Sequence, residues 1–179
     1  VAHAFPLAAL AGLVAAAGPC ATTLLGTSFG DNLPSLLFLW SLLLLVDARR
    51  ATRVDGSGAL VLLADQDRSR WDRTLIEEGQ TLVVQALTGG APGPYGLQAA
   101  IAAVHDEAAT VETTDWPQIV GLYNVLRVTA PSPVVELNRA VAVAMVDGDE
   151  AGLALIDGVA DSGELDRYHL LHAARGRLL

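Results

Sequence analysis

The chain contains no lysine. All eleven of its basic residues are arginine, against twenty acidic residues, and the formal net charge is −9. The acidic excess lies in residues 74–179, which hold fourteen acidic residues and five arginines. Because nucleic-acid affinity comes largely from Lys and Arg that displace counterions, we expect no direct binding of DNA or RNA. Residues 49–73 are mildly basic, which suits an acidic protein partner.

The chain contains one cysteine, Cys20, so it cannot form an internal disulfide. A single cysteine fits a protein of the reducing cytoplasm. A reactive thiol needs an electropositive setting, and no charged residue lies within ten positions of Cys20. Motifs of metal, redox and nucleotide chemistry are missing as well, since no HExxH, CxxC or GxGxxG occurs. We therefore expect a protein that is not an enzyme and that needs no cofactor.

Charge is also missing from the beginning of the chain, where Asp31 is the only Asp, Glu, Lys or Arg before residue 47. The apolar run LPSLLFLWSLLLLV is shorter than the roughly 20 residues that a membrane-spanning helix needs. We therefore predict a buried helix over residues 35–50 and no membrane span. Residues 1–35 are interpreted as an apolar segment of uncertain origin, and residues 36–179 as a helical domain whose last helix continues beyond the chain.

Helical periodicity dominates the remaining sequence and predicts an all-α fold. The breaks TGGAPGPYG, TAPSP and DGD separate apolar stripes at helical spacing. One small β-hairpin is expected near residues 52–63, where Val54 and the run ALVLL flank the turn sequence DGSG. Ser69 and Asp72 resemble a capping box at the start of the next helix, and we place Trp71 in the apolar stripe of that helix.

The helical segments repeat at an interval of 34 residues. Asp115 and Asp149, 34 positions apart, each open a helical hairpin, and the strings LNRA and LHAA recur at the same offset. The segment WPQIVGLY keeps the Trp and Tyr spacing of tetratricopeptide repeats. One helical hairpin cannot bury its apolar face alone, whereas stacked hairpins can. We therefore predict stacked antiparallel helical hairpins of the tetratricopeptide type.

Longer strings carry a family resemblance. The chain contains, in this order, LLADQDRSRWDRTLIEEG, PGPYGLQAAIAAVHDEA, TDWPQIVGLYNVL, PSPVVELNRAVAVAM and YHLLHAARG. Over residues 36–179 it resembles the tetratricopeptide-like C-terminal extension of a group of extracytoplasmic-function RNA polymerase sigma factors. In that family, sigma regions two and four precede the extension. The resemblance implies a bacterial, cytoplasmic, accessory domain that regulates transcription initiation through contacts with the sigma core or RNA polymerase.

The charged stretch before the second predicted helix is the first candidate partner-binding surface. Its candidate residues are Asp65, Asp67, Arg68, Arg70 and Trp71. Arginine forks suit carboxylate partners, and a half-exposed tryptophan would suit the centre of an interface. The alternative is a capped helix start with exposed ion pairs, each contributing at most about 1 kcal/mol.

Equivalent positions of the repeat supply a second candidate surface. Gln98, Asn138 and His172 each follow a leucine of the repeat, and they are interpreted either as inter-helix hydrogen-bonding groups or as a polar strip for a ligand. His105 and Arg139 complete the set of candidate partner-binding residues. Two further functions stay open: a freestanding tetratricopeptide-like adaptor that binds a peptide, and a metal-dependent enzyme that would use the histidines.

Overall fold

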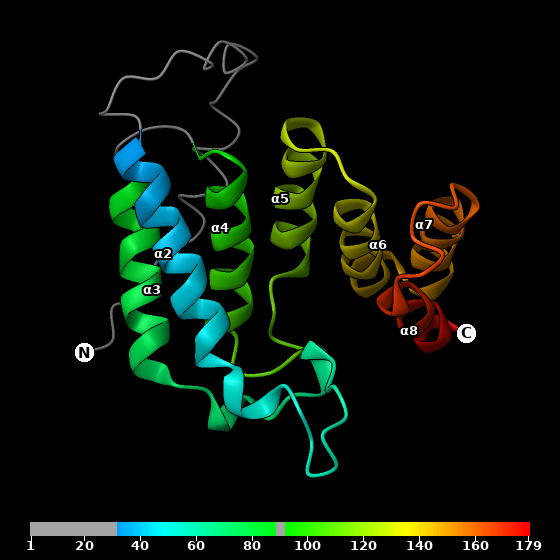
Figure 1. Cartoon of the computed structure of the whole chain (residues 1–179), viewed down its shortest axis with the longest axis horizontal. Helices are drawn as coiled ribbons and strands as arrows, with labels where there is room; N and C mark the ends of the chain where they lie inside the picture. The colour runs from blue at the N-terminus through cyan, green and yellow to red at the C-terminus, as the bar shows by residue number, and fades with distance from the viewer. Residues whose placement is uncertain (1–31, 89–91) are drawn as a thin grey trace. The chain divides into compact units, whose positions relative to one another are not determined.

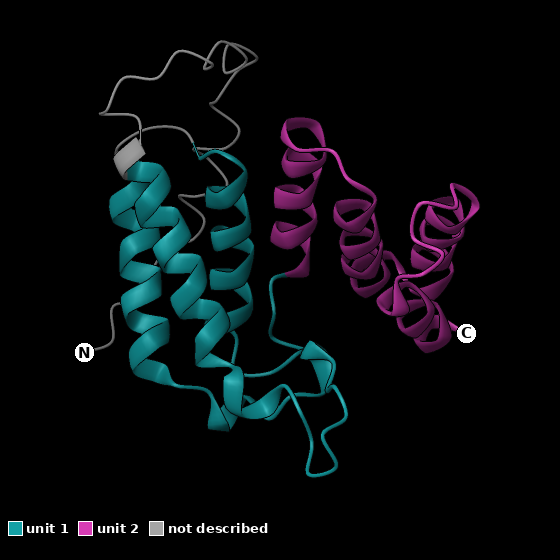
Figure 2. Ribbon diagram, in the orientation of Figure 1, with its two compact units in different colours: residues 1–115 teal, residues 116–179 magenta. Residues whose placement is uncertain are grey.

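The computed structural model describes residues 32–88 and 92–179. Within these ranges the chain is mostly α-helical and contains no sheet, which confirms the predicted helical class (Figure 1). The chain divides into two compact units, Val1–Asp115 and Trp116–Leu179 (Figure 2). None of the described helices is both long enough and apolar enough to cross a membrane.

The described part of unit 1 contains three α-helices, α2 (Asn32–Ala48), α3 (Arg73–Leu87) and α4 (Pro94–Glu107). Each of the three packs against the other two (Figure 1). At the crossing of α2 and α3, a Cβ atom on Gly79 would lie only 2.8 Å from Leu45 Cγ, so glycine permits this close approach. The buried core includes Phe38, Leu45, Trp71, Ile76, Val83, Ala86, Ala99 and Ala103.

The β-hairpin predicted near residues 52–63 does not form. A single antiparallel bridge joins Val54 and Leu60 instead. The loop is held locally by Asp55, whose Oδ1 accepts hydrogen bonds from the backbone N–H of Ser57 and from the N–H of Ala59. Val54 and Leu60 are both exposed, and an isolated pair of short strands without a buried face is unstable in water. The pairing therefore stops at one bridge.

The start of α3 also differs from the predicted capping box. Asp72, rather than Ser69, is the N-cap residue, and its Oδ1 accepts hydrogen bonds from the N–H groups of Thr74 and Leu75. Trp71 precedes the helix in an extended conformation, at the end of the 3-10 turn Arg68–Arg70. Aspartate is a preferred N-cap residue, and its negative charge also meets the positive end of the helix dipole.

Unit 2 contains α5 (Trp116–Thr129), α6 (Pro133–Asp147), α7 (Asp149–Asp161) and α8 (His169–Leu178). Each helix packs against the next along the chain (Figure 1). The predicted breaks are confirmed here, since TAPSP lies between α5 and α6 and DGD between α6 and α7. The core of the last three helices includes Leu137, Ala140, Ile156, Leu165 and Leu171.

Two glycines of α7 provide a matched test of the packing of unit 2. A Cβ on Gly152 would collide with the Cβ of Ala144 and lie 3.0 Å from the carbonyl oxygen of Ala140, whereas a Cβ on Gly158 meets nothing within 4 Å. We expect Gly152→Ala to lower the free energy of unfolding by about 1–3 kcal/mol through overpacking. Gly158→Ala should raise it by roughly 0.5–1 kcal/mol, because alanine is the better helix former. Urea unfolding followed by circular dichroism measures both, and two changes of the same sign would contradict this packing.

Candidate docking surfaces and the buried arginine cluster

Trp71, a candidate docking residue, lies in the core of unit 1 with 3% of its surface exposed. Two guanidinium groups lie over its ring. The Cζ atoms of Arg49 and Arg68 are 5.3 Å and 5.1 Å from the ring centroid, within the range of cation–π attraction. The indole N–H donates a hydrogen bond of 3.0 Å to Thr52 Oγ1. Trp71 is therefore a core residue that contacts Arg49, Arg68 and Thr52. Its assignment to an exposed docking surface is wrong.

Arg68 is buried with it, at 5% exposure, so the alternative interpretation as an exposed ion pair is wrong for this residue too. One of its terminal nitrogens donates hydrogen bonds of 2.9 Å to the carbonyl oxygens of His105 and Ala108. These carbonyls lie at the C-terminal end of α4, where helical carbonyls lack internal partners and the helix dipole favours a cation. Arg68 therefore acts as the cap of α4, supplied from a distant part of the chain.

Arg49 completes the link between the end of α2 and the end of α4. Its Nε lies 2.7 Å from Asp106 Oδ1 in a buried ion pair, and its NH2 group donates a 3.2 Å hydrogen bond to the carbonyl of Ala102. We refer to Arg49, Arg68, Trp71, His105 and Asp106 as the arginine cluster. It joins α2, the 3-10 turn before α3, and α4.

Burial sets the protonation of the two titratable groups in the cluster. It raises the pKa of Asp106 to about 6, although the charges of Arg49, Arg68 and Arg73 oppose the rise. Burial lowers the pKa of His105 to about 3, and the charges of Arg49 and Arg68 lower it further. At neutral pH the cluster therefore holds a neutral imidazole next to an ionised carboxylate.

The two pKa shifts predict opposite effects of pH on the free energy of unfolding, and these effects cancel between about pH 4 and pH 6. In this window the folded chain holds a proton on Asp106 that the unfolded chain has lost, and the unfolded chain holds one on His105 that the folded chain lacks. Removing Asp106 by Asp106→Asn leaves the histidine effect, so stability should rise with pH by up to about 1.4 kcal/mol per pH unit relative to wild type. His105→Gln leaves the carboxyl effect, so stability should fall with pH at a similar slope.

Urea unfolding at pH 4, 5 and 6 measures these slopes in the wild type and both variants. The wild type serves as the control, because all other titrating groups are common to the three proteins. Three parallel pH profiles would contradict the assigned protonation states.

Three residues of the charged stretch do remain at the surface: Asp65, Asp67 and Arg70. Asp67 caps the 3-10 turn by accepting a hydrogen bond from the N–H of Ser69. This bond, and a second from the Ser69 hydroxyl, lower the pKa of Asp67. Arg70 reaches the carbonyl of Ala51 at 3.4 Å. The exposed remnant is small, and its role in partner binding stays a prediction.

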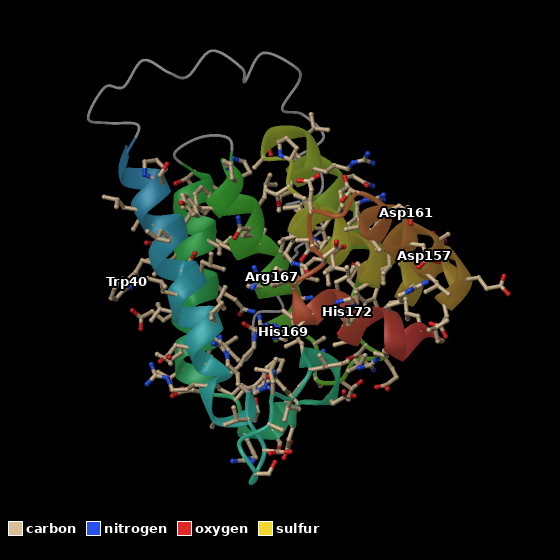
Figure 3. All side chains as sticks on the ribbon, turned by 45° about the vertical axis from the view of Figure 1, so that its right-hand side comes forward. Trp40, Asp157, Asp161, Arg167, His169 and His172 are labelled. Atoms are coloured by element: carbon tan, nitrogen blue, oxygen red, sulfur yellow. The ribbon has the colours of Figure 1, made fainter. Side chains whose placement is uncertain are left out.

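The residues at equivalent repeat positions are exposed, each next to a buried leucine of its helix. Gln98 belongs to unit 1, and Asn138 and His172 belong to unit 2. Burial therefore does not oblige these side chains to find a partner, and both interpretations, inter-helix hydrogen bonding and a polar strip for a ligand, stay predictions. His172 lies on α8, with its Nε2 3.0 Å from the carbonyl oxygen of Asp166 (Figure 3). Arg139 is partly buried and its Nε lies 3.1 Å from Glu136 Oε2.

In the described part of the chain, no group of three or more His, Cys, Asp or Glu residues is placed so that it could hold a metal ion. His105 belongs to the arginine cluster of unit 1, while His169 and His172 lie on α8 of unit 2 (Figure 3).

An exposed apolar face on α2 was missed by sequence reasoning. It consists of Leu36, Leu39, Trp40 and Leu43, which are 60%, 37%, 55% and 53% exposed. The spacing i, i+3, i+4, i+7 places these side chains on one face of a helix, and Trp40 projects outward from α2 (Figure 3). The sequence signal that could have revealed this face is the lack of a polar side on the helix. Such a helix has apolar residues on more than one side, and each apolar side needs a packing partner.

Comparison with known proteins adds a family match. Residues 12–87 match the model of DUF6596, a family of unknown function. The chain is also 46% identical over 146 residues to an uncharacterized protein of Rhizobium meliloti (strain 1021), a match that covers 82% of this chain and 34% of the relative. The chain therefore spans about a third of the length of that relative. No solved structure matches the chain significantly.

The DUF6596 match begins before residue 36, the expected start of the helical domain. It includes α2 with its exposed apolar face, and it ends with α3 at Leu87. Arg49, Arg68 and Trp71 lie within the matched residues, and their α4 partners, His105 and Asp106, lie beyond them. Unit 1 therefore extends past the matched residues to complete its buried cluster.

Proposed function

We propose that the chain is an accessory, non-catalytic interaction domain of an RNA polymerase sigma factor, which regulates transcription initiation through protein contacts. The observation that carries this proposal is the set of five ordered sequence strings that resemble the extension of such factors. The length of the Rhizobium meliloti relative is consistent with it, because about two thirds of that protein lies outside the match.

The arrangement of unit 2 supports the tetratricopeptide-like part of the proposal. Helix α5 begins at residue 116 and α7 at residue 149, 33 positions later, while α6 and α8 begin 36 positions apart, at residues 133 and 169. Both intervals are close to the 34 residues of that repeat. The two helix pairs meet through α6, which packs against α7 and α8. Stacked helix pairs in repeat proteins form extended surfaces for protein contacts.

Arg68 and Trp71 of the string LLADQDRSRWDRTLIEEG have an internal role in unit 1, since they connect the turn before α3 to α4. We therefore interpret the string as a marker of the fold of unit 1 rather than of its contact surface. The contact surface must be sought among exposed side chains.

A capture experiment tests the proposed function. The tagged chain is immobilised and exposed to purified RNA polymerase core and to sigma regions two and four from the bacterium that encodes it, and retained proteins are identified by mass spectrometry. We expect retention of the sigma regions or of the polymerase, and a changed transcript yield when the chain is added to a reconstituted initiation reaction.

The control is the Trp71→Ala variant, in which the core of unit 1 is damaged; retention that depends on a folded unit 1 should be lost with it. If the wild-type chain retains neither protein but binds extended peptides saturably, the chain is an adaptor and the proposal fails.

A further inference from the structure

The outward face of α2 is the largest run of exposed apolar side chains on a single helix in the described residues. Leu36, Leu39, Trp40 and Leu43 extend over two turns, and Asp47 is the only charged residue between Asn32 and Ala48. Monomeric proteins rarely expose continuous apolar patches larger than a few hundred Å², and such patches commonly mark contact sites. The opposite side of α2 packs against α3 and α4.

The chemistry of this face excludes several kinds of partner. Nucleic acids and acidic peptides need cations, and the face has none. Helices that lie on membranes are rich in Lys and Arg on their polar side, whereas α2 contains no basic residue. An uncharged apolar surface of another protein is the complementary partner, and an exposed tryptophan at its centre matches the residue type that dominates binding energy in interfaces.

The size of the face indicates what kind of contact it makes. A large aromatic side chain presents roughly 150–250 Å². With 55% of Trp40 exposed, together with 37–60% of each of three smaller leucines, the face offers on the order of 400 Å². A stable complex needs about 800 Å² on each partner. The face alone is therefore too small for a permanent homodimer, and it suits a weak contact that can be regulated.

We infer that the sigma core docks on the outward face of α2 through an uncharged apolar surface, with Trp40 at the centre of the contact. This inference rests on the proposed function and specifies the surface that performs it. It also replaces the surface expected from sequence, because Trp71 and Arg68 are buried whereas Trp40 is exposed.

The test compares the affinity of purified sigma regions two and four for four forms of the full chain. The informative variant is the double substitution Trp40→Ser and Leu43→Ser, which removes the tryptophan and one of the three leucines of the face and leaves the residues of the buried core unchanged. Val128→Ser is the matched control, because Val128 is an apolar residue of unit 2 that is 79% exposed. Arg70→Ala probes the exposed remnant of the charged stretch. Circular dichroism establishes that all four forms are folded.

We expect the double variant to weaken binding at least tenfold, while the two other variants stay within twofold of wild type. Unchanged binding by the double variant overturns the docking face and leaves the proposed function standing. A loss confined to Arg70→Ala also overturns it, in favour of the charged turn. If wild type binds no sigma region, the inference fails, and the proposed function fails with it only if the chain also binds no RNA polymerase core. A wild-type homodimer that the double variant abolishes, or wild-type binding to phosphatidylglycerol vesicles, would assign the face to another partner and refute the inference.

Discussion

Replacing Arg49 with methionine is expected to lower the free energy of unfolding of unit 1 by about 3–5 kcal/mol, the usual effect of removing one partner of a buried ion pair. The substitution deletes the 2.7 Å contact with Asp106 and the hydrogen bond to the carbonyl of Ala102. It also removes one of the two cations over Trp71. Methionine preserves most of the apolar volume, so the loss reports the polar interactions. Urea unfolding followed by tryptophan fluorescence measures the change.

The neighbouring arginine provides the control. Arg50 pairs with Asp47, but its side chain is 80% exposed, and exposed ion pairs contribute at most about 1 kcal/mol. Arg50→Met should therefore change stability little. Equal effects of the two substitutions would show that the buried cluster does not hold α2 to α4.

Replacing Trp71 with alanine is expected to destabilise unit 1 by about 3–5 kcal/mol, as for other large-to-small changes of buried aromatic residues. Two guanidinium groups lie over the ring, and its loss leaves a cavity next to the buried charges of Arg49 and Arg68. Unfolding is followed by far-ultraviolet circular dichroism, because the variant loses its main fluorescent reporter.

Trp40→Ala is the matched comparison, since it removes the same side chain from the exposed face of α2, where 55% of the residue is exposed. We expect a loss below about 1 kcal/mol for this surface substitution. A larger loss for Trp40→Ala than for Trp71→Ala would contradict the assignment of one tryptophan to the core and the other to the surface.

Periodicity was sufficient to predict the helices, because their breaks carry strong local signals. Pro94 and Pro133 lie at the first position of α4 and α6, and Gly148, with φ of 96°, separates α6 from α7. These residues act through local backbone geometry. The β-hairpin was over-predicted because its turn signal is local, while a stable hairpin also requires a buried face that Val54 and Leu60 do not have.

The arginine cluster could not be predicted from local pattern. Arg49 and Asp106 are 57 residues apart, and Arg68 reaches carbonyl oxygens 37 and 40 residues away. From sequence alone, a tryptophan next to arginines is predicted to lie at the surface, because arginine is rarely buried without partners. Only tertiary packing supplies those partners here, which is why a core residue was assigned to a docking surface.

The exposed face of α2 was missed for the complementary reason. An apolar helix without a polar side is normally buried all round, so the run containing Trp40 was predicted to be core. Packing against α3 and α4 covers one side of it, with Phe38 and Leu45 fully enclosed. The sequence indicates that the apolar surface of α2 must be buried. It does not indicate which side of α2 is covered by the other helices of the chain.

Site-specific photo-cross-linking shows whether unit 1 meets the sigma core through α2. A photoreactive p-benzoylphenylalanine is introduced in place of Trp40, and in a second protein in place of Val128, before irradiation with sigma regions two and four. The account predicts a sigma adduct from position 40 and none from position 128. A sigma adduct from position 128 alone would contradict it.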